Sequence, residues 1–129
     1  MRVLRRVLTV GLLVSVVAWA GTEEERAVAE GAEALSAEEL EALYLGNTVA
    51  GITPGGYRFE TYVAADGSIP ATERRGSGEF TVPEDGKACM RFDDVWEGQL
   101  RCWTYYRIEN GIRMYNEEGA PAADIEPGG

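Results

Sequence analysis

The chain has 129 residues and an acidic composition, with 22 Asp or Glu against 12 Lys or Arg, and it contains no histidine. The lack of histidine excludes Ser-His and Cys-His nucleophile pairs, His-ligated haem and the usual His-containing zinc sites. The net charge of −10 argues against nucleic acid and anionic membrane surfaces as partners, because their phosphates demand Lys and Arg. We therefore predict no catalytic residue, no metal site and no cofactor.

Residues 1–20 have the three parts of a secretory signal peptide. Three arginines precede an apolar run over residues 7–19, and an Ala-x-Ala triplet ends at Ala20. The run is shorter than the roughly 20 residues that a membrane-spanning helix needs, although an uncleaved anchor is the alternative. We predict cleavage after Ala20, a periplasmic or secreted location, and no membrane contact after cleavage. The leader holds three arginines and no acid, so the remainder carries a charge of −13.

A short helix is predicted at the start of the exported part. Residues 21–34 are rich in Ala and Glu and can be helical, but they have little to bury, so we expect a flexible segment. Ser36 and Glu39 then form a capping-box pattern, which predicts a helix over residues 37–45. Gly46 can provide its left-handed C-terminal cap.

After Gly46 the apolar residues follow a period of two, punctuated by Asp-Gly and Asn-Gly turns. The strand candidates cover residues 48–51, 57–64, 68–75, 79–83, 87–92, 100–108 and 112–115. Tight turns make neighbouring strands antiparallel. We therefore predict a mainly β fold in residues 35–116, an antiparallel meander forming a small curved sheet or open barrel with the short helix at one end. Residues 117–129 are predicted to be a disordered tail.

The two cysteines, Cys89 and Cys102, both lie in the exported part. An isolated pair in an oxidising compartment usually forms a disulfide, and two thiolates are too few for a structural zinc site. We predict a structural Cys89–Cys102 disulfide.

Aromatic residues suggest a binding site. Alternation places Trp103 and Tyr105 on one face of their strand, and Cys102, Thr104 and Tyr106 on the other. One interpretation is a ligand-binding cup in a barrel, where aromatic rings stack on an apolar or sugar-like ligand. The other is an ordinary core with cross-strand aromatic pairs. The possible ligand-binding residues are Tyr57, Phe59, Trp96, Trp103 and Tyr105.

Charged clusters give weaker hypotheses. Asp93, Asp94 and Glu97 lie in one loop, and a calcium site or a hydrolytic carboxylate pair is weighed there against a solvated loop. We expect the solvated loop. The adjacent Arg74 and Arg75 could grip an acidic ligand, but pairing with surface glutamates is expected.

The order of motifs resembles a family of small, mostly uncharacterised exported (periplasmic) domains of proteobacteria. The residues that carry the resemblance are Gly46-Asn47-Thr48, then Asp85-Gly86-Lys87-Ala88-Cys89, then Cys102-Trp103. The resemblance implies a periplasmic β-domain with a paired cysteine, and no catalytic residues to transfer.

These patterns together predict an exported, non-enzymatic binding or interaction module. Its partner would be an unknown small ligand or a basic protein, because the charge favours a basic surface. The alternatives are an inhibitor of a basic cell-wall hydrolase such as lysozyme, and a carboxylate-dependent hydrolase.

Overall fold

The computed structural model describes residues 21–127, so the predicted signal peptide lies outside the described residues. Two short helices, α2 (Glu23–Ala29) and α3 (Ala37–Tyr44), accompany a single sheet. Its nine strands are β1 Glu33–Ala34, β2 Asn47–Ile52, β3 Arg58–Val63, β4 Ser68–Ile69, β5 Gly78–Glu84, β6 Lys87–Phe92, β7 Arg101–Ile108, β8 Gly111–Tyr115 and β9 Pro121–Ile125. Within residues 21–127, no helix is both long and apolar enough to cross a membrane.

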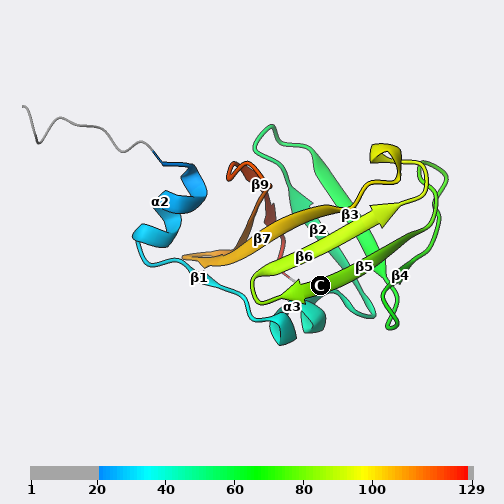
Figure 1. Ribbon diagram of the computed structural model, residues 1–129, viewed down its shortest axis with the longest axis horizontal. Coiled ribbons are helices and arrows are strands. Elements are labelled where there is room, and N and C mark those ends of the chain that lie inside the picture. The colour runs from blue at the N-terminus through cyan, green and yellow to red at the C-terminus, as the bar shows by residue number, and fades with distance from the viewer. Residues whose placement is uncertain (1–20, 128–129) are drawn as a thin grey trace, which may run out of the picture.

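The sheet curls into a nearly closed antiparallel barrel, which confirms the predicted fold class. The strand order is β3-β2-β9-β8-β7-β6-β5-β4, and β1 pairs with β7. The two ends of this order, β3 and β4, are consecutive in the chain and are joined by the tight turn at Gly67. In Figure 1, β5, β6 and β7 cross in front of β2 and β3, so two layers of strands enclose the interior.

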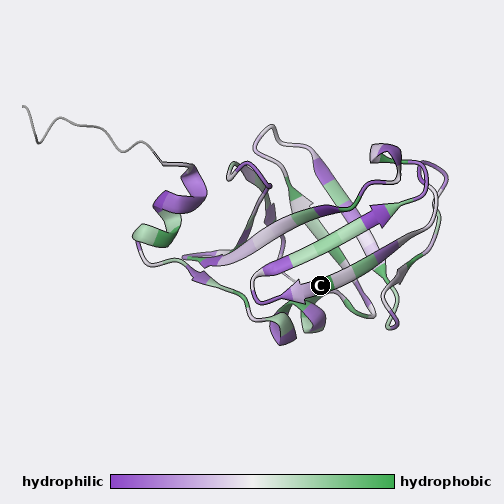
Figure 2. Ribbon diagram, viewed as in Figure 1, coloured by the Kyte–Doolittle hydropathy of each residue, from purple (hydrophilic) through white to green (hydrophobic). Residues whose placement is uncertain are grey.

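The core lies inside this barrel and takes alternate residues from each strand. On β6 the interior positions are Ala88, Met90 and Phe92, as the alternation predicts. Figure 2 shows the apolar colour along the middle of β6 and the hydrophilic colour at its ends. Alternation between interior and exterior side chains is expected where one face of a strand meets the core and the other meets solvent.

Helix α3 follows the predicted pattern closely. The Ser36 hydroxyl accepts from the Glu39 backbone N–H, and the Glu39 carboxylate accepts from the Ser36 N–H, which completes the capping box. Gly46 has a φ of 77°, the left-handed conformation that ends the helix. The helix contacts β2, β5 and β6 and buries Leu40 and Tyr44 in the barrel.

Two predictions about the ends of the domain are wrong. The flexible segment contains α2, whose Glu24 carboxylate accepts from the Thr104 and Tyr106 hydroxyls at 2.6 and 2.7 Å. The disordered tail contains β9, which pairs with both β8 and β2. The local sequence of β9 is rich in Ala and acid, and pairing on both sides overrides its weak strand propensity.

One predicted strand is much shorter than expected. Within residues 68–75 only Ser68–Ile69 forms a strand, and Pro70 follows it at once. Proline has no N–H to donate to a ladder, so the strand ends there. The chain then makes a tight turn between Thr72 and Arg75, whose backbone groups bond each other at 2.7 and 3.4 Å.

Candidate functional site

The barrel interior is not filled throughout. A cavity of about 340 Å³, the aromatic cavity, lies between the β6–β7 side and the β3 side of the barrel. Its principal large side chains are Phe59, Met90, Phe92, Trp96, Trp103 and Met114. Ligand sites of this kind are concave and mostly apolar, with volumes of about 300–1,000 Å³.

Three rings form a contiguous wall of this cavity. The centroids of Phe92 and Trp96 are 5.5 Å apart, and those of Trp96 and Trp103 are 5.6 Å apart. Both pairs are tilted, a geometry that aromatic quadrupoles favour over a face-to-face sandwich. The wall therefore combines two strands, β6 and β7, with the loop that joins them.

The loop between β6 and β7 positions Trp96 through an unusual backbone conformation. Trp96 and Glu97 have φ values of 55° and 56°, and Gly98 follows at 72°. Consecutive left-handed residues other than glycine are rare and cost about 1–2 kcal/mol each. Two backbone bonds close the turn, Gly98 N–H to Val95 O at 3.1 Å and Gln99 N–H to Trp96 O at 2.9 Å. Strain of this kind often accumulates where a side chain is held for binding.

The opposite wall depends on a glycine. Gly51 on β2 pairs directly with Phe59 on β3. A Cβ added to Gly51 would lie 2.7 Å from the Phe59 ring, which is too close for real atoms. The absence of a side chain at Gly51 therefore lets the Phe59 ring lie against β2 at the edge of the cavity.

A tyrosine pair separates the cavity from the filled core. Tyr44 lines the cavity, and its hydroxyl is 2.7 Å from the Tyr105 hydroxyl. Both residues are almost completely buried, at 1% and 0% exposure. Burial raises the pKa of Tyr44 to about 12, and burial with the neighbouring Tyr44 raises the pKa of Tyr105. Both phenols therefore stay neutral well above physiological pH.

The structure brings together three of the five predicted ligand residues. Phe59, Trp96 and Trp103 line the cavity. Tyr105 faces the same interior but belongs to the filled core. Tyr57 is 65% exposed and lies outside the cavity. It precedes β3, and its backbone N–H bonds to Thr53 in a turn.

Arg75 lines the cavity, so its predicted place in a surface ion pair is wrong. Surface pairing with glutamates was expected, but within residues 21–127 Arg75 forms no ion pair. Its guanidinium carbon instead lies 4.3 Å from the centroid of the Phe92 ring. Among the described lining residues it is the one charged side chain. No local pattern marks it, because the side chain meets Phe92, a residue of β6.

The predicted disulfide is confirmed and lies away from the cavity. Cys89 and Cys102 are directly paired across β6 and β7 and are bonded. The adjacent interior positions on the same strands are Met90 and Trp103, both of which line the cavity. The bond therefore fixes the two strands that carry the aromatic wall.

The acidic loop is tied to the neighbouring turn. The Asp94 carboxylate accepts from the Gly76 N–H at 2.8 Å, and the Asp93 carboxylate accepts from the Ser77 hydroxyl at 2.9 Å. Asp93, Asp94 and Glu97 are all exposed, and none lines the aromatic cavity. Over residues 21–127, no three Asp, Glu or Cys side chains converge to hold a metal ion.

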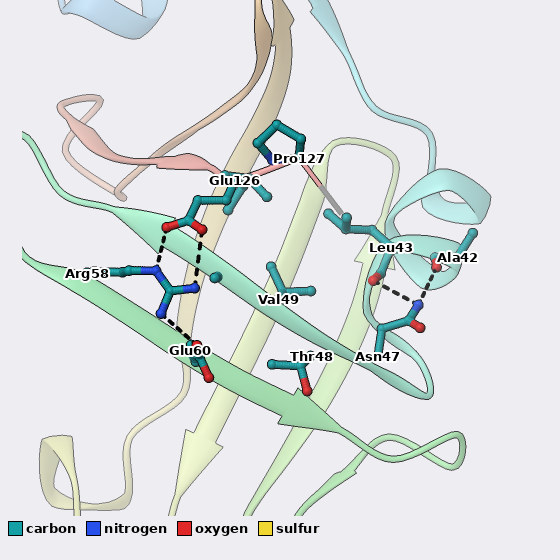
Figure 3. Close-up of a pocket in the computed structure, with 11 residues that line it drawn as sticks. Ala42, Leu43, Asn47, Thr48, Val49, Arg58, Glu60, Glu126 and Pro127 are labelled. Carbon is teal, nitrogen blue, oxygen red and sulfur yellow. Dashed lines mark hydrogen bonds and ion pairs between the residues drawn. The ribbon is translucent and has the colours of Figure 1, made fainter. Parts of the chain in front are cut away.

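A second depression, the outer groove, lies between α3 and strands β2 and β3, with a volume of about 510 Å³. Figure 3 shows that its charged groups bond each other. Arg58 contacts Glu126 through two nitrogens, at 2.6 and 3.2 Å, and Glu60 at 2.6 Å. The Asn47 amide donates to carbonyls at the end of α3. These groups have partners already, so the outer groove is the weaker candidate.

Comparison with known proteins found no relative of this chain. A scan against protein-family models, a search of curated proteins and a search of solved structures each found no match to this chain.

Proposed function

We propose that this protein is an exported, non-enzymatic binding module that holds a small apolar ligand in the aromatic cavity. The observation that carries the proposal is the cavity itself, about 340 Å³ of space beside Trp96, Trp103 and Phe59. The cavity is partly open to solvent, so a ligand can reach it, and ligand pockets of this size are likewise lined mostly by apolar and aromatic side chains.

The lining favours an apolar ligand over a sugar. Its hydroxyl groups come from Thr53, Thr61 and Tyr44. Thr53 already accepts from the Tyr57 N–H, and Tyr44 already bonds Tyr105. A sugar would bring many hydroxyls into a place with few free partners, and each unpaired one would cost desolvation energy. An alkyl or aromatic group would meet mainly aromatic rings, methionines and small apolar side chains.

Export is the second part of the proposal, and three features support it. The leader over residues 1–20 has the signal-peptide pattern, and the Cys89–Cys102 bond belongs to oxidising compartments. The charge of −13 after cleavage would keep the domain soluble outside the cytoplasm. These features support a periplasmic or secreted location.

A fluorescence titration tests the binding proposal. In protein purified after export, without the leader and its Trp19, the remaining tryptophans are Trp96 and Trp103. Both line the cavity, so their emission reports on it directly. We expect 1-octanol to change the emission saturably and glucose to leave it unchanged. A linear, unsaturable response to 1-octanol would contradict the proposal.

A pair of variants adds a matched control. Phe59→Ala removes an aromatic wall of the cavity and is expected to weaken 1-octanol binding about tenfold. Tyr57→Ala removes an exposed ring two residues away and is expected to leave binding unchanged. Equal losses in the two variants would show that the ligand binds elsewhere.

A further inference from the structure

The backbone that carries Arg75 is fixed on both sides. On the N-terminal side, the Thr72 N–H donates to the Arg75 carbonyl at 2.7 Å. On the C-terminal side, the Gly76 N–H donates to the Asp94 carboxylate at 2.8 Å. The residue that links these two anchored points directs its side chain to the aromatic cavity. Arg74, its neighbour, is exposed.

The guanidinium of Arg75 is partly desolvated and has an unused donor. Its central carbon lies 4.3 Å from the Phe92 ring centroid, within the range of a cation–π contact. Its Nε atom is buried and meets no hydrogen-bond partner among residues 21–127. No other buried side-chain nitrogen or oxygen in this part of the chain lacks a partner. A buried donor on a charged group is costly to leave unpaired, so an acceptor is expected to arrive from outside the chain.

The charge around Arg75 specifies the kind of acceptor. Within the described lining, Arg75 supplies one positive charge and no carboxylate supplies a negative one. The acidic loop residues Asp93 and Asp94 are exposed, bond to Ser77 and Gly76, and do not line the cavity. The lining of the cavity therefore carries a single positive charge inside a strongly acidic protein. A ligand with a negative group would supply both the acceptor and the compensating charge.

We propose that the ligand of the aromatic cavity is a small apolar carboxylic acid, bound with its carboxylate on Arg75 and its tail against Trp96 and Trp103. This inference rests on the proposed function and adds the chemical class of the ligand to it. Arginine suits the task because its planar fork donates along a carboxylate edge while its face stacks on an aromatic ring. The Nε atom is enclosed by the chain, so the guanidinium turns toward the ligand on binding, and its Nε–H and one terminal N–H then engage the carboxylate edge.

Three probes with the same tail and different heads test the inference. Octanoate, 1-octanol and octylammonium are titrated calorimetrically into the exported protein at neutral pH. We expect octanoate to bind at least about tenfold more tightly than 1-octanol, because it adds a charge-assisted hydrogen bond in a desolvated place. Octylammonium is expected to bind most weakly. Equal affinities for octanoate and 1-octanol would overturn the inference while leaving the proposed function intact. Failure of all three probes to bind would overturn the proposed function itself.

Variants at the two neighbouring arginines test whether Arg75 is the residue that binds the carboxylate. Arg75→Met keeps an apolar stem over Phe92 and removes the charge, so we expect it to abolish the preference for octanoate while 1-octanol still binds. Arg74→Met is the matched control and is expected to keep the full preference, because Arg74 is exposed. Preserved preference in Arg75→Met, or lost preference in Arg74→Met, would overturn the inference.

A measurement on the unsubstituted protein covers the case in which Arg75→Met fails to fold. The Nε–H groups of arginine give their own signals in ¹H–¹⁵N NMR spectra. We expect one such signal, present also in Arg74→Met, to move to lower field when octanoate is added and to stay in place with 1-octanol. No arginine Nε–H signal responding to octanoate would contradict contact with Arg75.

Discussion

Trp103 and Tyr105 are two residues apart on β7 and face the same barrel interior, yet they have different surroundings. Tyr105 is completely buried and bonds Tyr44, whose ring packs at 4.6 Å from Phe80. Trp103 is only partly buried and borders the aromatic cavity. The difference comes from α3, which buries Tyr44 against Tyr105 with the ring centroids 5.9 Å apart. Trp103 instead packs against Trp96 of the β6–β7 loop, with ring centroids 5.6 Å apart, and the cavity lies beside both rings.

The largest expected effect is on stability at Tyr105. Tyr105→Ala would open a void in the filled core and leave the Tyr44 hydroxyl without its partner, so we expect a loss of about 3–5 kcal/mol in the free energy of unfolding. Trp103→Ala enlarges an existing space and is expected to cost less than half as much. Urea unfolding followed by circular dichroism measures both. Equal losses would mean that Trp103 is an ordinary core residue.

The disulfide is the next largest contribution. It closes a loop with a sequence separation of 13, and loops near this size are worth about 3 kcal/mol in the chain-entropy model. The double variant Cys89→Ala/Cys102→Ala is expected to lose about that amount in urea unfolding. Reducing agent should lower the free energy of unfolding of the unsubstituted protein by the same amount. It should leave that of the double variant unchanged. A shift of the double variant by reductant would show that the effect is not the disulfide.

The tyrosine pair predicts a pH dependence of the filled region. An unfolded tyrosine ionises near pH 10, whereas burial raises the pKa of Tyr44 to about 12 and also raises that of Tyr105. The folded state then holds protons that the unfolded state releases, so stability falls as pH rises above ~10, at roughly 1 kcal/mol per pH unit per tyrosine.

Urea midpoints between pH 9 and about pH 12 check this slope. Tyr44→Phe/Tyr105→Phe should show a shallower decline, and Tyr57→Phe should keep the original one because Tyr57 is exposed. A decline that is the same in all three proteins would place the alkaline sensitivity outside the filled region.

The smallest expected effect concerns the turn at the cavity. Glu97 holds a φ of 56°, which glycine adopts without strain. Glu97→Gly is expected to raise the free energy of unfolding by up to about 1 kcal/mol. Glu109→Gly, at an exposed turn position whose φ is not positive, should give no gain. Calorimetric melting of both variants measures these changes. If Glu109→Gly were stabilised as well, backbone strain at Glu97 would not explain the gain.

Much of the fold follows from local signals that sequence reasoning can find. The capping box at Ser36, the Asp66-Gly67 turn and the alternation along residues 87–92 all appear where they were predicted. Strand β9 could not be found this way, because its pairing with β2 joins residues more than seventy positions apart. The turn before it does carry a signal, since the Asn116 side chain accepts from the Glu118 and Ala120 backbone N–H groups.

The candidate site was only partly predictable for a related reason. Alternation shows that Trp103 and Tyr105 face inward, but it cannot show whether other elements fill the space beside each one. The role of Tyr44 as the boundary depends on how α3 docks. The role of Arg75 depends on the next residue, Gly76, whose N–H is held by Asp94 eighteen positions further along the chain. Both are consequences of tertiary packing, which a single sequence does not display.

A crystal structure of the exported protein grown with octanoate tests the central claim most directly. We expect the alkyl chain between Trp103 and Phe59 and the carboxylate within hydrogen-bonding distance of Arg75 Nε, with Tyr105 still bonded to Tyr44. Rings of Trp96 and Phe92 collapsed into the cavity, with no octanoate inside the barrel, would contradict the claim that this region is built to hold a ligand.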